Sequence, residues 1–349
     1  SDMSKIIKKI KYFWQVFRWF VLDNLLHNEI KKMRHLFLIM LKHYFCRRPH
    51  SAIIETGNTC NFQCATCPTP HKLIYARRAP MMMGLVEFKK IIDHIKNFVH
   101  IVYVYNSNEP LLNPDIVEMI KYANQANLHT MISTNASLLT QEKSRALLSS
   151  GLGEIRFALD GLTKQSFEAF RRGGNFEQVI GNIRRFCQIK QELKKHRPIV
   201  TLQFILNRYN QEQIPDIKKF AKEIKADKLY IKPFILSPYA YNEEERKVLA
   251  RKFFPTKDID DEEIVYKKEN ENLVPKRQPQ RCPAVKRVFT VLANGEMVMC
   301  CFDLFGDYSY GNLIAKDFKS LWFSDKGKKM RRLAYKRFFP LCQKCGNIE

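Results

Sequence analysis

The sequence of 349 residues lacks any apolar run of the roughly 20 residues that a membrane-spanning helix needs. It also lacks a small-residue cleavage site behind a clean apolar segment, so we do not expect a signal peptide. Acidic residues are scarce: 35 Asp and Glu stand against 59 Lys and Arg, which leaves a formal net charge of +24. This excess favours an anionic partner, such as nucleic acid, an anionic membrane or a phosphorylated substrate.

The ten cysteines are grouped and do not have the spread of a disulfide framework. Thiolate groups that bind metal need a reducing compartment, so we expect a cytoplasmic protein. Cys60, Cys64 and Cys67 have the spacing C-x3-C-x2-C, and three close thiolates can hold three irons of a [4Fe–4S] cluster. The fourth iron then stays open for a ligand that is not protein. A zinc site or redox thiols are the alternative, with His71 as the nearby candidate for a further zinc ligand.

This cysteine spacing resembles that of the radical S-adenosylmethionine (SAM) superfamily. In that family the open iron binds SAM, and one electron from the cluster splits SAM into a 5′-deoxyadenosyl radical that takes hydrogen from a substrate. The resemblance implies a [4Fe–4S] cluster held by the three cysteines, SAM as a cofactor, and a reductase such as flavodoxin or ferredoxin.

From residue 52 onward, short apolar strands alternate with helical patterns. The expected strands cover Ala52–Thr56, Ile101–Tyr105, Thr130–Ser133, Ile155–Leu159, Val200–Ile205 and Lys228–Lys232. Helical patterns lie between them, at Leu85–Phe98, Asp115–Ala126, Gln141–Ser149, Phe176–Lys195 and Ile214–Ile224. This alternation predicts an α/β fold with parallel strands covered by helices. Six units match the partial (β/α)6 TIM-like barrel of the family, and sites on such barrels form at the carboxyl ends of the strands.

Two segments behind the second and third expected strands resemble SAM-binding motifs of the family. Glu109 follows Asn108 and precedes Pro110, a run similar to Gly-Glu-Pro with asparagine in place of glycine. The resemblance implies that Glu109 accepts hydrogen bonds from the SAM ammonium; a charge that complements a helix N-terminus is the alternative. Ser133 and Asn135 resemble a Ser-Thr-Asn motif whose side chains reach the SAM ribose or carboxylate.

Further candidates follow the fourth, fifth and sixth strands. Asp160 lies in a run similar to Ser-Leu-Asp-Gly, with Ala158 in place of serine, and Arg171 lies in one similar to Tyr-Arg-x-Gly-Gly. Arg171 has the donor fork that could pair with the SAM carboxylate, and a surface-exposed arginine is the alternative. Gln203 resembles the polar position of the fifth strand, and Lys232 ends the sixth strand, where an inward side chain meets the substrate. A satisfied polar residue inside the barrel is the alternative for both.

A second cysteine group surrounds a predicted hairpin, whose turn at Gly295 separates residues 288–292 from residues 297–300. This segment resembles the SPASM extension in its shorter "twitch" form, with four candidate ligands: Cys282, Cys300, Cys342 and Cys345. Four thiolates suit one closed auxiliary [4Fe–4S] cluster. A structural zinc site with the same ligands is the alternative.

Three cysteines remain outside these two groups. Cys301 could replace Cys300 as a ligand, donate a hydrogen atom to a substrate radical, or simply pack. Cys46 and Cys187 we expect to be buried or partly buried thiols without a role.

The first 50 residues combine apolar positions at helical spacing with lysines and aromatic rings, among them Trp14 and Phe17. A basic amphipathic helix of this kind suits an anionic membrane surface, while packing across the barrel, a dimer contact and RNA binding are the alternatives. The expected domains are a helical extension (1–50), the barrel (51–236), a charged connection or lid (237–281) and the auxiliary cluster domain (282–349).

The resemblance implies an enzyme that abstracts hydrogen from a substrate C–H bond, with the auxiliary cluster accepting or passing an electron or shaping the pocket. The run that resembles Tyr-Arg-x-Gly-Gly is similar to a branch of the family that acts on sugars, aminoglycoside-type molecules and envelope components. The basic N-terminal segment favours a lipid or lipid-linked substrate, presented at the inner face of the membrane. Peptide modification, as in many SPASM enzymes, is an alternative function. Modification of tRNA or RNA is another, and nucleic acid is the less favoured partner. A non-catalytic scaffold that carries clusters is the alternative outside enzymology.

Overall fold

The computed structural model describes residues 37–38, 48–69, 74–237, 240–256, 266–269, 272–275, 279–343 and 345. The predicted N-terminal helical extension lies almost entirely outside these residues, as do Cys46 and His71. No helix within the described ranges is long and apolar enough to cross a membrane.

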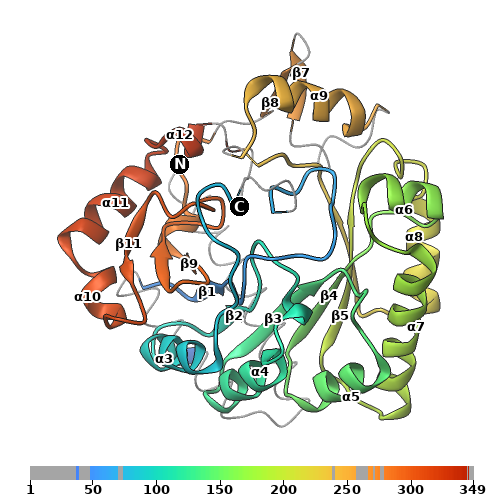
Figure 1. Ribbon diagram of the computed structural model, residues 1–349, viewed down its shortest axis with the longest axis horizontal. Coiled ribbons are helices and arrows are strands. Elements are labelled where there is room, and N and C mark those ends of the chain that lie inside the picture. Colours follow the sequence, from blue (N-terminus) through green and yellow to red (C-terminus); the bar gives the residue numbers. More distant parts are fainter. Residues whose placement is uncertain are drawn as a thin grey trace, which may run out of the picture.

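A large curved sheet forms the centre of the fold (Figure 1). Within the described residues it contains nine strands, in the order β11-β10-β9-β1-β2-β3-β4-β5-β6. Six of these strands run parallel in chain order: β1 (Ser51–Ile54), β2 (Ile101–Tyr103), β3 (His129–Thr134), β4 (Glu154–Ala158), β5 (Ile199–Ile205) and β6 (Lys228–Lys232). The parallel strands and their covering helices confirm the predicted partial barrel.

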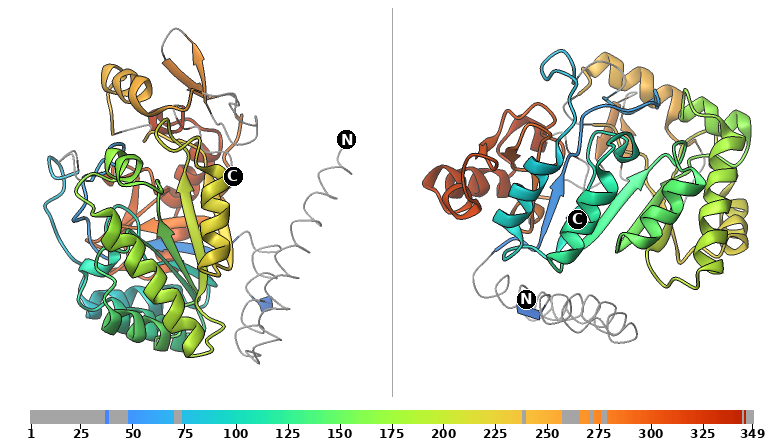
Figure 2. Two further views of the ribbon diagram at one scale, coloured as in Figure 1. Left: turned by 90° about the vertical axis from the view of Figure 1, so that its right-hand side faces the viewer. Right: turned by 60° about the horizontal axis from the view of Figure 1, so that its bottom comes forward.

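Helices cover the outer face of this sheet (Figure 1, Figure 2). They are α3 (Leu85–Ile95), α4 (Ile116–Gln125), α5 (Gln141–Ser149), α6 (Lys164–Phe170), α7 (Phe176–Glu192) and α8 (Ile214–Glu223). In α3 the buried side chains are Phe88, Ile91, Ile92 and Ile95, which recur at the three- and four-residue spacing of one helix face. Burying that face removes apolar surface from water, so the period in the sequence determines which side of the helix meets the sheet.

The C-terminal segment extends the barrel sheet. β9 (Val288–Val291) pairs in parallel with β1, and Ala52 stands opposite Phe289. β10 (Glu296–Val298) and β11 (Ser309–Asn312) continue that side in antiparallel order. The hairpin of β9 and β10 was predicted, whereas its attachment to β1 was not.

Burial explains why β9 lies against β1. The side chains of Ala52 and Phe289 are fully buried, and Phe289 also contacts the rings of Phe318 and Trp322 at centroid distances of 5.1 and 5.9 Å. A lone hairpin would leave this apolar face in water.

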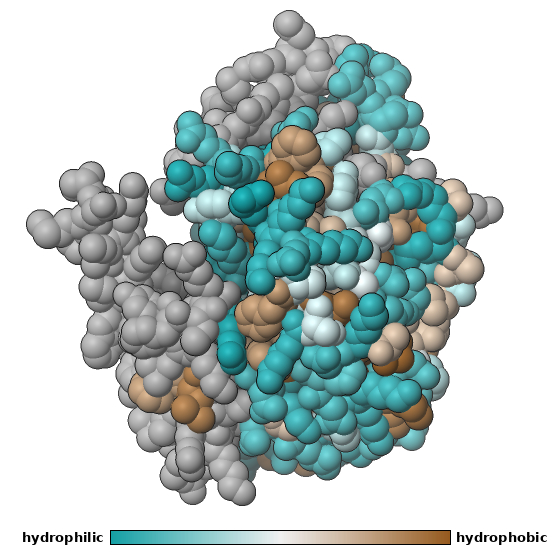
Figure 3. All heavy atoms as spheres, turned by 90° about the vertical axis from the view of Figure 1, so that its left-hand side faces the viewer, coloured by the Kyte–Doolittle hydropathy of each residue, from teal (hydrophilic) through white to brown (hydrophobic). Residues whose placement is uncertain are grey.

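Short helices complete the C-terminal segment: η3 (Ala284–Lys286), α10 (Phe318–Trp322), α11 (Asp325–Tyr335) and α12 (Pro340–Gln343). Phe318 and Trp322 of α10 are buried against the hairpin. The outward face of this region is mostly hydrophilic (Figure 3), and α11 carries the cationic run KGKKMRR over residues 326–332.

The predicted connection between barrel and auxiliary segment contains regular structure. Asn242 and Glu245 form a capping box at the start of α9 (Glu243–Phe253), and β7 (Tyr266–Glu269) pairs with β8 (Asn272–Pro275). Ala250 and Phe253 are the buried side chains of α9, and the ring of Phe253 contacts Phe170 edge-on. The helix was missed because its few apolar residues lie among many charges.

Candidate active site

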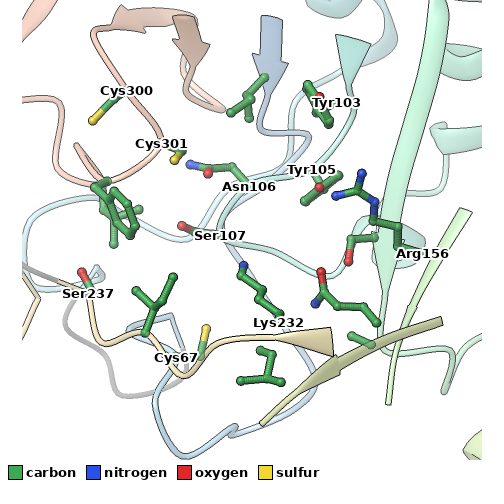
Figure 4. Close-up of a pocket in the computed structure, with 18 of the residues that line it drawn as sticks. Cys67, Tyr103, Tyr105, Asn106, Ser107, Arg156, Lys232, Ser237, Cys300 and Cys301 are labelled. Carbon is green, nitrogen blue, oxygen red and sulfur yellow. The ribbon is translucent and has the colours of Figure 1, made fainter. Parts of the chain in front are cut away.

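One cavity of about 1860 Å³ opens on the inner side of the curved sheet. Its wall includes Cys60, Cys64 and Cys67 from the loop after β1, and Cys282, Cys300 and Cys345 from the C-terminal segment. Figure 4 shows Cys67 and Cys300 on different sides of this space, with Ser107 between them and Lys232 beside Cys67. The two predicted cysteine groups therefore share one cavity.

The loop that carries the first three cysteines is held by the chain at the end of α6. The amide of Gln63 donates to the carbonyl of Arg172 at 2.7 Å, and the amide of Ala65 donates to the carbonyl of Phe170 at 2.8 Å. Phe62 is buried and meets Phe167 edge-on. These contacts fix a loop that has no regular structure of its own.

Burial changes the pKa of two of the three thiols, Cys60 and Cys64. Burial raises the pKa of Cys60 to about 12 and the pKa of Cys64 to about 11, and the neighbouring sulfurs add to both shifts. Metal binding has to displace the thiol protons, and a bound cation supplies the charge that stabilises a thiolate.

Glu109 lies in the cavity wall with its carboxylate almost fully buried. It accepts hydrogen bonds from the amide of Leu111 at 3.0 Å, the hydroxyl of Thr134 at 2.7 Å and the amide of Asn135 at 2.8 Å. Burial raises the pKa of Glu109, and these donors oppose that shift. Glu109 is therefore both a rigid part of the wall and the N-cap of η1 (Pro110–Leu112).

The third strand contributes Ser133 and Asn135 to the wall. The side-chain oxygen Oδ1 of Asn135 accepts hydrogen bonds from the backbone amide and the hydroxyl of Ser137 at 2.9 and 2.7 Å. Its side-chain nitrogen Nδ2 donates to Oδ1 of Asn61 at 3.0 Å. Asn135 thus braces the cysteine loop, a role that the motif alone did not indicate.

Arg171 and Asp160 form a buried ion pair. Nε of Arg171 lies 2.6 Å from Oδ2 of Asp160, and one terminal nitrogen lies 2.5 Å from the same oxygen. The other terminal nitrogen donates to Sγ of Cys64 at 3.5 Å. Arg171 lines the cavity and its side chain is only 13% exposed, so the alternative of a surface arginine is wrong.

Asp160 is not among the side chains that line the cavity. Its side chain is fully buried behind the cavity wall. There its second oxygen, Oδ1, accepts a hydrogen bond from the backbone amide of Ile205 at 2.6 Å. The carboxylate orients Arg171 and ties β4 to β5. We propose that Asp160 acts as a positioning residue for Arg171, whereas the sequence resemblance predicts a contact with the cofactor.

Gln203 and Lys232 both lie on the cavity wall, as expected for inward positions of β5 and β6. Gln203 is nearly buried, at 9% exposure. Lys232 projects from the end of β6 into the space beside Ser107 and Cys67 (Figure 4).

The four predicted auxiliary ligands gather at the other side of the cavity. Burial raises the pKa of Cys342 to about 11, and Cys282 and Cys345 add to the shift. Burial likewise raises the pKa of Cys300, with Cys301 and Cys342 as neighbours. The carbonyl of Cys345 accepts a bond from Arg337 at 2.8 Å. Cys342 lies behind the wall, whereas Cys301 lines the cavity.

Cys187 is buried in α7, as expected.

The donor sets fit iron–sulfur clusters. No three His, Cys, Asp or Glu side chains within the described ranges converge on a point that one metal ion would occupy. A zinc ion needs its sulfur ligands at about 2.3 Å, whereas a [4Fe–4S] cluster binds each thiolate at a different iron. The donor sets, three cysteine thiols in one group and four in the other, are of the type that [4Fe–4S] clusters bind.

Sequence reasoning missed several polar residues on the cavity wall, among them Tyr103, Tyr105 and Arg156. They point into the space opposite Lys232 (Figure 4). Alternation along β4 was the available signal, since Glu154, Arg156 and Ala158 all face inward.

Comparisons with known proteins agree with this geometry. Residues 54–221 match the family model of the Radical SAM superfamily, and residues 282–346 match the SPASM iron–sulfur cluster-binding domain. The chain is 25% identical to the PqqA peptide cyclase of Bradyrhizobium diazoefficiens over 52% of this chain and 46% of that protein. The match thus spans about half of that relative.

Two longer similarities cover most of the chain. The tungsten-containing aldehyde ferredoxin oxidoreductase cofactor-modifying protein of Pyrococcus furiosus is 21% identical over 84% of this chain and 86% of that protein. The crystal structure of Streptococcus suis SuiB bound to precursor peptide SuiA superposes with a TM-score of 0.60 at 16% identity, covering 91% of this chain and 76% of that one. At this identity the structural likeness concerns the fold alone.

Proposed function

Because the chain belongs to the radical SAM superfamily and carries a SPASM domain, we propose that it modifies an unreactive C–H bond of a sugar, lipid or lipid-linked metabolite. The radical SAM domain binds a [4Fe–4S] cluster and SAM, and the SPASM domain binds auxiliary iron–sulfur clusters. When bound, the reduced cluster and SAM supply a radical that removes hydrogen from the substrate.

The single observation that carries the proposal is the shared cavity. Its wall runs from the first cysteine group to the second, so a substrate held there lies between the two predicted clusters. The cavity volume of about 1860 Å³ exceeds the roughly 300–1,000 Å³ of ordinary ligand pockets, which leaves room for SAM and a second molecule.

The residues of the cavity wall have different proposed roles, according to where they lie. Cys60, Cys64 and Cys67 would hold the first cluster. Glu109 would offer its buried carboxylate to the ammonium group of SAM. Arg171, held by Asp160, places a cation beside Cys64. Rigid placement of this kind brings reacting atoms together and limits the access of water.

The four remaining ligands, Cys282, Cys300, Cys342 and Cys345, are enough for one auxiliary [4Fe–4S] cluster in this chain. Reduction of either cluster needs an electron donor such as flavodoxin or ferredoxin.

The first test of this proposal is the cleavage of SAM in the absence of substrate. Protein reconstituted anaerobically with iron and sulfide and reduced with dithionite should convert SAM to 5′-deoxyadenosine and methionine. A reducible cluster whose electron paramagnetic resonance signal ignores added SAM, or zinc in place of iron, would contradict the proposal. A non-catalytic scaffold would form no 5′-deoxyadenosine.

Peptide modification is the second candidate, and the names of two similar proteins favour it, PqqA peptide cyclase and SuiB bound to a precursor peptide. Lipid, polar-metabolite and peptide fractions of a cell extract should be added separately to reduced enzyme and SAM. The fraction that raises 5′-deoxyadenosine formation identifies the class. Stimulation by the peptide fraction alone would favour this second candidate.

The proposed place of action is the surface of an anionic membrane, argued from the basic aromatic sequence of residues 1–50. The full-length protein should float with vesicles of anionic lipid and remain in the pellet fraction with neutral vesicles. Absence of flotation with anionic vesicles would remove the membrane from the proposal.

A further inference from the structure

The inner face of the sheet carries cationic side chains away from the cysteine loop. Arg156, Thr201 and Lys228 are register partners on β4, β5 and β6, and all three line the cavity. Neighbouring strands lie about 4.8 Å apart, so the backbones at Arg156 and Lys228 are separated by about 10 Å. Two long side chains at that separation can flank one group.

Lys232 adds a third cation to this face. It is four residues beyond Lys228 on β6, so the two side chains point to the same side of the strand and both line the cavity. We call Arg156, Lys228 and Lys232 the cationic wall.

One carboxylate compensates part of this charge. Oε1 of Glu154 accepts hydrogen bonds from Nε of Arg156 at 2.7 Å and from the hydroxyl of Thr201 at 3.0 Å. Its other oxygen, Oε2, lies 3.6 Å from Nζ of Lys228.

Asp160 also interacts electrostatically with Lys232, but it is itself paired with Arg171. Counted with that ion pair, four cations (Arg156, Lys228, Lys232 and Arg171) face two carboxylates (Glu154 and Asp160), an excess of two positive charges.

Such an excess is unusual for a barrel interior, where branched apolar side chains normally fill the layers. Charge that is removed from water without a counter-charge costs free energy. Side-chain exposures of 24% for Arg156 and 37% for Lys228 fit an open, ligand-accessible wall.

Aromatic rings border the same space. Tyr103 and Tyr105 contact each other edge-on at 6.2 Å, and the hydroxyl of Tyr105 is hydrogen-bonded to Arg156. Figure 4 shows Arg156 directed toward Tyr105. This border offers ring faces and hydroxyl groups beside the cations, which suits the sugar or other polar body of a phosphate ester.

We infer that the cationic wall binds a phosphate or diphosphate group of the substrate, and so selects a phosphorylated metabolite. A phosphate monoester carries about −1.5 to −2 charges at neutral pH, which matches the excess of +2. Arginine binds such oxygens through its planar fork of donors, and lysine as a point charge. The inference rests on the proposed function, because it requires that the substrate occupies this cavity.

Binding of inorganic pyrophosphate tests the inference without turnover. Full-length protein, reconstituted and loaded with SAM under anaerobic conditions, is titrated calorimetrically with pyrophosphate. Arg156→Gln and Lys228→Gln should each weaken binding at least tenfold. The matched controls Arg332→Gln and Lys326→Gln change exposed residues of α11 that lie outside the cavity wall, and they should stay within twofold of the unmodified protein.

Circular dichroism and iron content establish that each variant is folded and loaded. Should Arg156→Gln fail to fold, Lys228→Gln decides, because its side chain is more exposed. Absence of pyrophosphate binding by the unmodified protein, or equal losses in the α11 controls, would overturn the inference. Tighter binding of succinate than of pyrophosphate would overturn it in favour of a carboxylate substrate. Formation of 5′-deoxyadenosine by the same unmodified preparation separates this failure from failure of the proposed function.

Discussion

Single residues near the cysteine loop show how chemistry and support are divided. The sequence motifs place Asp160 and Arg171 together as cofactor contacts, but only Arg171 reaches the cavity. Asp160 neutralises and orients it from behind. A local motif indicates that both side chains matter, yet their separate roles depend on which one the fold turns inward.

The first residue-scale prediction concerns this ion pair. Asp160→Asn keeps the shape but leaves Arg171 without its buried counter-charge, which should lower the free energy of unfolding by about 3–5 kcal/mol. Anaerobic denaturation by urea measures the loss. Asp93→Asn is the control, because Asp93 pairs with Lys96 at the surface and should change stability by less than about 1 kcal/mol. Equal effects of the two substitutions would contradict the role assigned to Asp160.

Adjacent cysteines allow a second prediction at this scale. Cys300→Ala should lose the auxiliary cluster, whereas Cys301→Ala should keep the iron content of the unmodified protein, because Cys301 is predicted to be the spare thiol. Iron and sulfide assays together with Mössbauer spectra distinguish the two. The reverse result would make Cys301 the ligand.

At the scale of elements, local patterns predicted most strands and helices but not every partner. β6 and α5 occupy the predicted ranges. The pairing of β9 with β1 joins distant parts of the chain, and nothing in either strand alone specifies the other. The burial of apolar faces on both strands determines this pairing. The predicted barrel and the predicted auxiliary domain, which begins at residue 282, therefore contribute strands to one continuous sheet.

Removing the ring at the centre of this junction tests its contribution. Phe289→Ala deletes a fully buried side chain that packs on Phe318 and Trp322, and should lower the free energy of unfolding by about 3–5 kcal/mol. Phe338→Ala, at a ring that is 63% exposed, should change it by less than about 0.5 kcal/mol. Thermal or urea unfolding gives both values. A small loss at Phe289 would mean that β9 is not held by this packing.

For the whole molecule, the defining feature is one cavity between two cysteine groups. The groups come from opposite ends of the described chain, and the extension of the sheet by β9 brings them to the same space. This arrangement permits a division of labour in which one group serves SAM cleavage and the other serves the later fate of the substrate.

Separate removal of the two groups tests that division. Replacing Cys60, Cys64 and Cys67 together by Ala should abolish 5′-deoxyadenosine formation and leave about one cluster's iron, because each cluster needs its own thiolates. Replacing Cys342 and Cys345 by Ala should spare at least part of the SAM cleavage and remove product. Chromatography of 5′-deoxyadenosine and iron analysis provide the measurements. Unchanged product formation in the second variant would refute an obligatory auxiliary cluster.

The sequence by itself determined the ligand chemistry and the repeating α/β units, because cysteine spacing and hydrophobic period are short-range properties of the chain. Only the tertiary structure decided that β9 joins β1, that Asp160 supports Arg171, and that Arg156 and Lys228 face one cavity with both cysteine groups. These relations depend on strand register and on which faces are buried, and both are fixed by contacts between residues far apart in the sequence.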